Sequence, residues 1–180
     1  LAGAMLARLK RTIEYENYTI FVGVRSIDAP TVAAIRREAR ADSRVQLCLY
    51  ELRDASSQAR ALNELLDAVR RFEHQHDVDF QTYFLQAPDT TTHPLALRMA
   101  NWHCEFASIV QLPVLTLPRG SLPLAGGSGL DDLGEHRARE LLLRAQTVHN
   151  VPVLDTGIAL RRDAIWALKL HGDVFDKTSP

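Results

Sequence analysis

The chain has 180 residues, of which 46% are hydrophobic and 24% are charged, and its formal net charge is −1. A chain of this length and composition favours one ordinary globular domain. Because its charges are interspersed and form no basic face, binding of nucleic acid through bulk electrostatics is not expected. No apolar run reaches the roughly 20 residues that span a bilayer. The two cysteines, Cys48 and Cys104, form no metal-type pair, which favours buried thiols in a reducing compartment.

The first half of the chain alternates between helical and extended patterns. The segment YTIFVGV is almost continuously apolar, as a strand covered on both faces would be. Asp28 precedes Pro30, and this order is typical of a helix start. We expect helices over residues 1–12, from 28 onward and over 56–76, and strands over residues 18–24 and 45–49.

The second half continues the alternation. We expect strands over residues 80–85, 109–117 and 151–159, and helices over residues 94–104, 130–146 and 163–170. Pro113 interrupts the second of these strands, which favours an edge or bent position. Residues 118–129 are rich in Gly, Pro and Ser and are predicted to be a loop. The whole pattern predicts an α/β fold with a mainly parallel sheet flanked by helices.

Polar residues follow three of the predicted strands, where parallel sheets bind their ligands. The acids at these positions are Asp28, Glu51, Asp54 and Asp89. They would meet in one crevice if the three strands were neighbours. The alternative is that Asp and Ser at these positions only cap the turns between strands and helices.

Other motifs favour structural roles over chemistry. The pair His74 and His76, with Asp77, resembles part of a metal-hydrolase motif but lies at a helix end without further ligands. His93 and His103 are too far apart along a helix to share a zinc ion. The GGSG segment at 126–129 lacks the spacing of a phosphate-binding loop.

Four segments carry a resemblance to a known family. They are ENYTIFVGVRSIDAPTVAAI (16–35), HPLALRMANW (93–102), VQLPVLTLPR (110–119) and VPVLDTGIALRRDAI (151–165). In order and spacing they resemble segments of family 2 glycosyltransferases, in the membrane-associated branch that is distantly similar to bacterial cellulose synthase. The resemblance covers nearly the whole chain.

The resemblance implies a GT-A fold, in which a Rossmann-like core binds a nucleotide-sugar donor. It implies transfer of a hexosyl unit to a glycan acceptor, with a Mg²⁺ or Mn²⁺ ion offsetting the charge of the diphosphate. It also implies a membrane-bound parent protein that holds the domain at the cytoplasmic, inner face of a bacterial membrane. Residues 1–180 would then be a single glycosyltransferase-like domain, incomplete at both ends. The family's catalytic base would follow Pro180, so no catalytic residue is assigned.

Residue by residue, the resemblance implies a small set of ligands. Asp28 stands in the Asp-Pro-x-Thr element, and Ser57 and Asn63 match the segment that helps to bind the nucleotide. Asp54, at a strand end, joins them as a predicted cofactor-binding residue. Asp89 is the remaining acid of the metal motif and the predicted metal ligand.

The sequence departs from the family's pattern in the segments that would bind the metal ion and the nucleotide. Gln86-Ala87-Pro88-Asp89 replaces the family's Asp-Ala-Glu-Asp, and Gln58 and Arg60 replace a Lys and an Asp. A lone carboxylate is a poor site for a hard divalent cation. Two hypotheses therefore stand: a working transferase, and an inactive pseudo-glycosyltransferase that serves binding or assembly with a protein partner. An unrelated α/β binding domain is a third.

Overall fold

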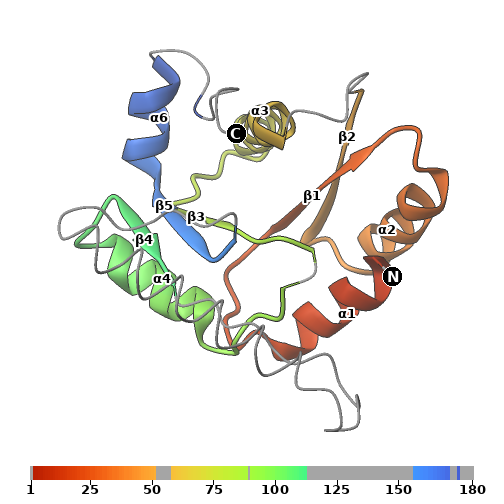
Figure 1. The fold of residues 1–180 in the computed structure, drawn as a ribbon, viewed down its shortest axis with the longest axis horizontal. Helices are drawn as coiled ribbons and strands as arrows, with labels where there is room; N and C mark the ends of the chain where they lie inside the picture. Colours follow the sequence, from red (N-terminus) through yellow and green to blue (C-terminus); the bar gives the residue numbers. More distant parts are fainter. Residues whose placement is uncertain (1, 52–57, 89, 113–155, 171–173, 175–180) are drawn as a thin grey trace, which may run out of the picture.

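The computed structural model describes residues 2–51, 58–88, 90–112, 156–170 and 174 (Figure 1). Its elements are α1 (Ala2–Thr12), β1 (Ile20–Arg25), α2 (Ala29–Ala41), β2 (Val45–Tyr50), α3 (Gln58–His76), β3 (Thr82–Leu85), α4 (Ala96–Cys104), β4 (Ile109–Gln111), β5 (Ile158–Arg161) and α6 (Arg162–Leu170). Across these ranges, no helix has the length and apolar character needed to cross a membrane. The predicted loop at 118–129 and helix at 130–146 lie outside the described residues.

The strands form two sheets. In the first, β1 and β2 are parallel, with Ile20 opposite Val45 and Arg25 opposite Tyr50. In the second, of order β3-β5-β4, both outer strands run antiparallel to β5. The α/β class is confirmed. The expectation of a mainly parallel sheet is wrong for the second of these sheets.

Gly157 explains why β5 lies between β3 and β4. Its φ is 74°, a backbone conformation that residues with a side chain rarely adopt. Its N–H donates to the carbonyl of Leu85 at 2.9 Å, and its own carbonyl accepts from the N–H of Leu112 at 2.8 Å. The glycine thus connects to both neighbours just before β5 begins. β5 begins at Ile158, and residues 151–155 of the strand predicted over 151–159 lie outside the described residues.

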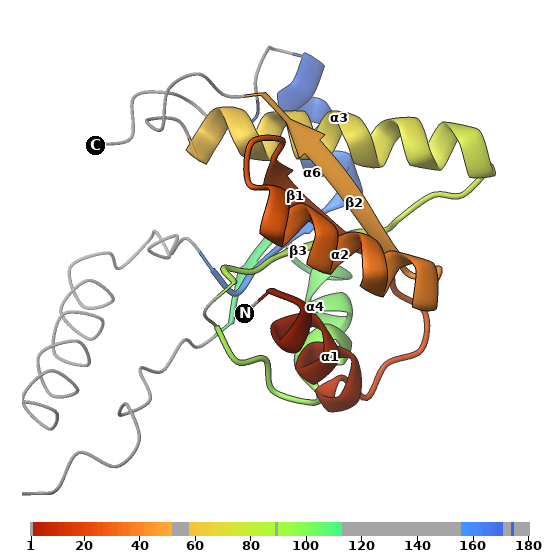
Figure 2. The same cartoon turned by 90° about the vertical axis from the view of Figure 1, so that its right-hand side faces the viewer.

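Helices cover both faces of the parallel pair. On one face α1 and α2 bury a cluster of aliphatic side chains with the strands, namely Leu6, Val24, Val32, Ile35 and Val45. On the other face lies α3, as Figure 2 shows. Its residues Leu66 and Val69 pack with Tyr83 of β3 and with β5 and α6, and Phe21 of β1 joins the same cluster. The long helix α3 therefore packs against strands of both sheets.

A buried carboxylate fixes the connection from α3 to β3. Glu73 is 4% exposed, and its Oε1 accepts hydrogen bonds from the N–H of Phe80 at 2.9 Å, from the Tyr83 hydroxyl at 3.0 Å and from Arg162. The bond from Phe80 draws that residue towards α3. This is why β3 begins at Thr82 and not at Phe80, as its apolar character had predicted.

Both cysteines are free thiols, as expected. Cys104 is buried in α4, where it packs with Ala100 and Ala159, and Cys48 is half-buried in β2. Burial raises the pKa of both thiols above the ordinary value, so neither is activated as a thiolate.

Candidate functional site

The predicted site residues do not come together within the described structure. Asp28 caps α2, where its Oδ1 accepts a hydrogen bond from the N–H of Thr31 at 3.2 Å. This is the capping role that had been the alternative to ligand binding. Asn63 lies in α3, is 5% exposed and already has an interaction. Asp54, Ser57 and Asp89 lie outside the described residues.

The segment after β3 is the place where the family resemblance implies a metal motif. Its first side chain, Gln86, is half-buried and bonded at both ends of its amide. The Nε2 donates to the carbonyl of Thr90 at 3.0 Å, and the Oε1 accepts from the hydroxyl of Thr92. Thr92 is itself buried. The Gln86 side chain therefore stabilises a turn and is not free to bind a ligand.

Thr156 joins this turn to the segment before β5. Its Oγ1 accepts from the N–H of Ala87 at 3.0 Å and lies 3.1 Å from the Oγ1 of Thr90. The two residues of the first bond are 69 positions apart in the chain. The sequence placed Thr156 only within the strand predicted over residues 151–159, so its hydrogen bonds were missed.

Gln111 closes the cluster from the side of β4. Its Nε2 donates to the carbonyls of Leu112 at 2.9 Å and of Thr156 at 3.0 Å, and also approaches that of Gly157 at 3.3 Å. The strand-end region is thus a network of amides, hydroxyls and backbone groups that bond to one another. Sequence reasoning missed Gln111 because a glutamine in a short strand carries no distinctive pattern.

These residues do not fit a divalent cation. Mg²⁺ and Mn²⁺ favour several carboxylate oxygens, whereas the described side chains here are neutral and already hydrogen-bonded. Among the residues that the structure describes, no group of three or more His, Cys, Asp or Glu side chains is placed to hold a metal ion. His74 and His76, in the last turn of α3, therefore belong to no such group among the described residues.

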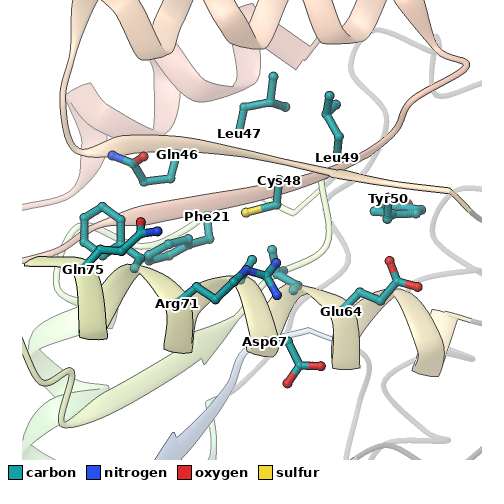
Figure 3. A pocket seen from close by; sticks show the side chains of 13 residues that line it. Phe21, Gln46, Leu47, Cys48, Leu49, Tyr50, Glu64, Asp67, Arg71 and Gln75 are labelled. Carbon is teal, nitrogen blue, oxygen red and sulfur yellow. The ribbon is translucent and has the colours of Figure 1, made fainter.

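A hollow lies elsewhere, between β2 and α3 (Figure 3). It has a volume of about 500 Å³, and its apolar lining includes Phe21, Leu65 and Phe72. Figure 3 shows the Cys48 thiol facing α3 and Arg71 reaching up from that helix. Neither Asp28 nor Asn63, the two predicted site residues that the structure describes, lines this groove.

The acids at the rim of this groove are engaged in ion pairs. Asp67 lies 3.2 Å from Lys169, and Glu64 lies 3.5 Å from Arg60 along α3. Both pairs have partly exposed members and are worth little in free energy. The groove therefore offers an apolar floor and a mixed-charge rim, and the residues described in its lining form no cluster of reactive groups.

Comparison with known proteins gives a distant relationship. The chain is 27% identical over 171 residues to bacteriophage adsorption protein B of Escherichia coli strain K12. The same values hold for bacteriophage N4 adsorption protein B of Escherichia coli O157:H7. The alignment covers 95% of this chain but only 23% of either relative. No family model matches the sequence, and no solved structure matches it.

Proposed function

We propose that this chain is a glycosyltransferase-like module that serves binding or assembly in a larger protein and does not itself transfer a sugar. The similarity to the two adsorption proteins over 95% of the chain supports the relationship. It agrees with the four segments that resemble family 2 glycosyltransferases. In this proposal the larger protein is membrane-bound, and the module lies at the cytoplasmic face of a bacterial membrane with a protein partner.

The observation that best supports a lack of transferase activity is the hydrogen bonding of Gln86. A transferase of this family would need an acidic, metal-binding side chain after β3, which offsets the charge of the departing diphosphate. Here a neutral amide follows the strand, and both of its ends are bonded to threonines of the same turn. The Thr156 hydroxyl then ties the turn to the opposite segment. In this proposal the Gln86 side chain holds the turn in place and binds no metal ion.

A second part of the family's site is altered independently. Arg60 stands where the resemblance places an aspartate of the nucleotide-binding segment, and it pairs with Glu64 one turn along α3. A guanidinium at this position reverses the local charge. Two separate changes in one functional site are more simply explained by lost selection for catalysis than by a new metal arrangement.

The test is calorimetric titration with UDP-glucose and UDP-N-acetylglucosamine in the presence and absence of Mn²⁺. We expect no binding heat at millimolar nucleotide and no effect of Mn²⁺ on the thermal midpoint. Heat that requires Mn²⁺ and disappears in Asp89→Ala would contradict the proposal and restore the transferase. Asp67→Asn is the matched control, because it removes a carboxylate that pairs with Lys169 and is not a predicted site residue.

A further inference from the structure

The outer edge of β2 has no partner strand among the described residues. β2 pairs with β1 on its other side, and Figure 2 shows it in front of α3, on the near side of the molecule. The N–H of Ser26 donates to the carbonyl of Tyr50 at 3.1 Å, so the even-numbered residues of β2 bond to β1. Because strand residues alternate, the N–H and C=O groups of Leu47 and Leu49 point to the outer edge.

The sequence of β2 does not protect this edge. Edge strands of natural proteins often carry a charged side chain, a proline or a bulge, each of which opposes pairing with another chain. The strand VQLCLY contains neither a charge nor a proline, and its register with β1 is unbroken from Val45 to Tyr50. The Leu49 side chain is 46% exposed. An apolar edge of this kind is a template for a further strand.

The groove between β2 and α3 runs along the same edge, and its two ends differ in charge (Figure 3). Arg71 emerges from α3 on the side where β2 begins, whereas Asp67 and Glu64 emerge on the side where it ends. Arg71 forms no ion pair with any residue that the structure describes. The two acids have partners, but their side chains remain 43% and 39% exposed. One end of the groove is therefore basic and the other acidic.

This edge is complementary to itself. A two-fold axis perpendicular to the sheet at Cys48 would place β2 of a second copy antiparallel to β2. Leu47 of each copy then lies opposite Leu49 of the other, and each such pair exchanges two backbone hydrogen bonds. The same axis brings Arg71 of each copy to the acidic end of the other copy's groove. Backbone groups and charges are thus matched by one symmetry operation.

The described hydrogen bonds select the position of this axis. Only residues with outward backbone groups can exchange bonds, so the axis passes at Leu47, Cys48 or Leu49. An axis at Leu47 would need the N–H of Val45, which already donates to a carbonyl of the preceding turn at 3.0 Å. An axis at Leu49 would need Glu51, which lies beyond the end of β2. The axis at Cys48 pairs the two open residues of β2 with each other.

We propose that two copies of this chain pair along β2, antiparallel and across a two-fold axis at Cys48, so that their parallel sheets form one continuous sheet and α3 of each copy closes the other's groove. The pairing covers Leu49 on the face of α2 and places the two Cys48 thiols side by side on the face of α3. The turn around Gln86 is not part of this interface, so the dimer does not depend on the proposed loss of activity.

Oxidative crosslinking tests the axis. Residues opposite each other in a non-hydrogen-bonded pair have Cα atoms about 4.5 Å apart, which a disulfide can span. Copper–phenanthroline should therefore convert the chain into a covalent dimer on non-reducing gels. The dimer should be lost in Cys48→Ser and kept in Cys104→Ser, since Cys104 is buried in α4. The absence of a covalent dimer, or its persistence in Cys48→Ser, would overturn the proposal.

Sedimentation equilibrium tests the pairing without an oxidant. We expect a reversible dimer of twice the 20.1 kDa of one chain, with a dissociation constant in the micromolar range. Leu49→Pro removes an outward N–H from each copy, and with it half of the shared hydrogen bonds. The dissociation constant should rise roughly 30-fold or more, while the monomer stays folded because a proline is tolerated at an open edge.

Ile109→Pro is the matched control for this variant. Ile109 is 49% exposed in β4, an outer strand of the second sheet. Its N–H also faces away from the partner strand, because the bonds to β5 are made by its neighbour Ser108 and by Leu112. Circular dichroism verifies that both proline variants are folded, and Ile109→Pro should leave the dissociation constant unchanged. Equal effects of the two prolines would place the contact elsewhere and overturn the proposal.

Hydrogen exchange separates the other possible occupants of the edge. In the proposed dimer, the amides of Leu47 and Leu49 exchange more slowly as the protein concentration rises. Slow exchange at every concentration with the mass of a monomer would mean that another part of the same chain covers the edge. A monomer with fast exchange would leave the edge open to a different partner. Either of these results would overturn the proposal.

Discussion

The hydroxyl oxygen of Thr156 lies 3.0 Å from the backbone nitrogen of Ala87 and accepts its hydrogen bond. This bond joins the turn after β3 to the segment before β5. Both partners are half-buried. This hydrogen bond holds the two segments together, and its contribution to the free energy of unfolding can be measured.

Thr156→Val should therefore destabilise the fold. The variant keeps the shape of the side chain but leaves the Ala87 N–H without its acceptor, and the loss of such a partner costs about 1–2 kcal/mol. Urea unfolding followed by circular dichroism measures this change. Thr156→Ser is the matched control, because it keeps the hydroxyl and should cost much less. Equal losses in the two variants would mean that the methyl group, and not the hydrogen bond, is what matters.

Gln86→Glu should destabilise the protein at neutral pH, although it restores an acid to the metal-motif segment. The carboxylate would face the carbonyl oxygen of Thr90, which now lies 3.0 Å from the amide nitrogen. We expect a loss of about 1–3 kcal/mol at pH 7. A protonated carboxyl group can donate to that carbonyl, so the folded state raises the pKa of the new side chain. The variant should accordingly regain this stability below the unfolded pKa of roughly 4.3. It should lose it again as the pH rises through the raised pKa of the folded state.

Gln86→Met is the control for this effect. It is of similar length, removes both hydrogen bonds and carries no charge, so the loss of stability relative to the wild type should not depend on pH between 4 and 7. If Gln86→Glu were as stable as the wild type at pH 7 and gained stability with Mn²⁺, the turn would still be able to bind a metal, and the proposed loss of function would be wrong.

Some features of the structure follow from local sequence patterns, and others depend on contacts between distant residues. Local signals predicted well: Asp28 and Pro30 open α2, and the apolar spacing of residues 58–76 forms α3. The turn around Gln86 was recognised as altered, but its bonding to Thr156 was not predictable. That contact joins residues far apart in the chain and depends on Gly157 adopting a positive φ. The antiparallel placement of β5 was missed for the same reason, since alternation of elements does not fix strand direction.

The carboxyl group of Asp42 should titrate well below the ordinary range. A side-chain hydrogen bond from Arg44, with a smaller contribution from Lys10, lowers its pKa from 3.8 to about 2. Because the folded pKa is lowered, the resulting stability is present above the unfolded pKa and is lost as the pH falls through about 2. A carboxyl-detected NMR titration measures the midpoint directly.

Two variants separate the causes of this shift. Arg44→Gln should return the Asp42 pKa most of the way to 3.8, whereas Lys10→Gln should change it much less, because Lys10 is the smallest of the contributions. A larger effect of Lys10→Gln would show that the charge of the lysine, 3.6 Å from the carboxylate, dominates over the arginine hydrogen bond.

Stability should also fall at alkaline pH because of Tyr83. Burial, and then the charge of Glu73, raise the pKa of the Tyr83 hydroxyl well above its ordinary value of 10.0. Above roughly pH 10 the unfolded chain ionises at this residue while the folded chain does not, so the unfolded state binds fewer protons and stability declines. The decline reaches at most about 1.4 kcal/mol per pH unit for one group.

Tyr83→Phe lacks the hydroxyl that donates to Glu73, so it should be about 1 kcal/mol less stable than the wild type at pH 8. Its stability should nevertheless decline less steeply between pH 10 and 11. Urea midpoints measured at several pH values test this, and an unchanged slope in Tyr83→Phe would assign the alkaline loss to another group.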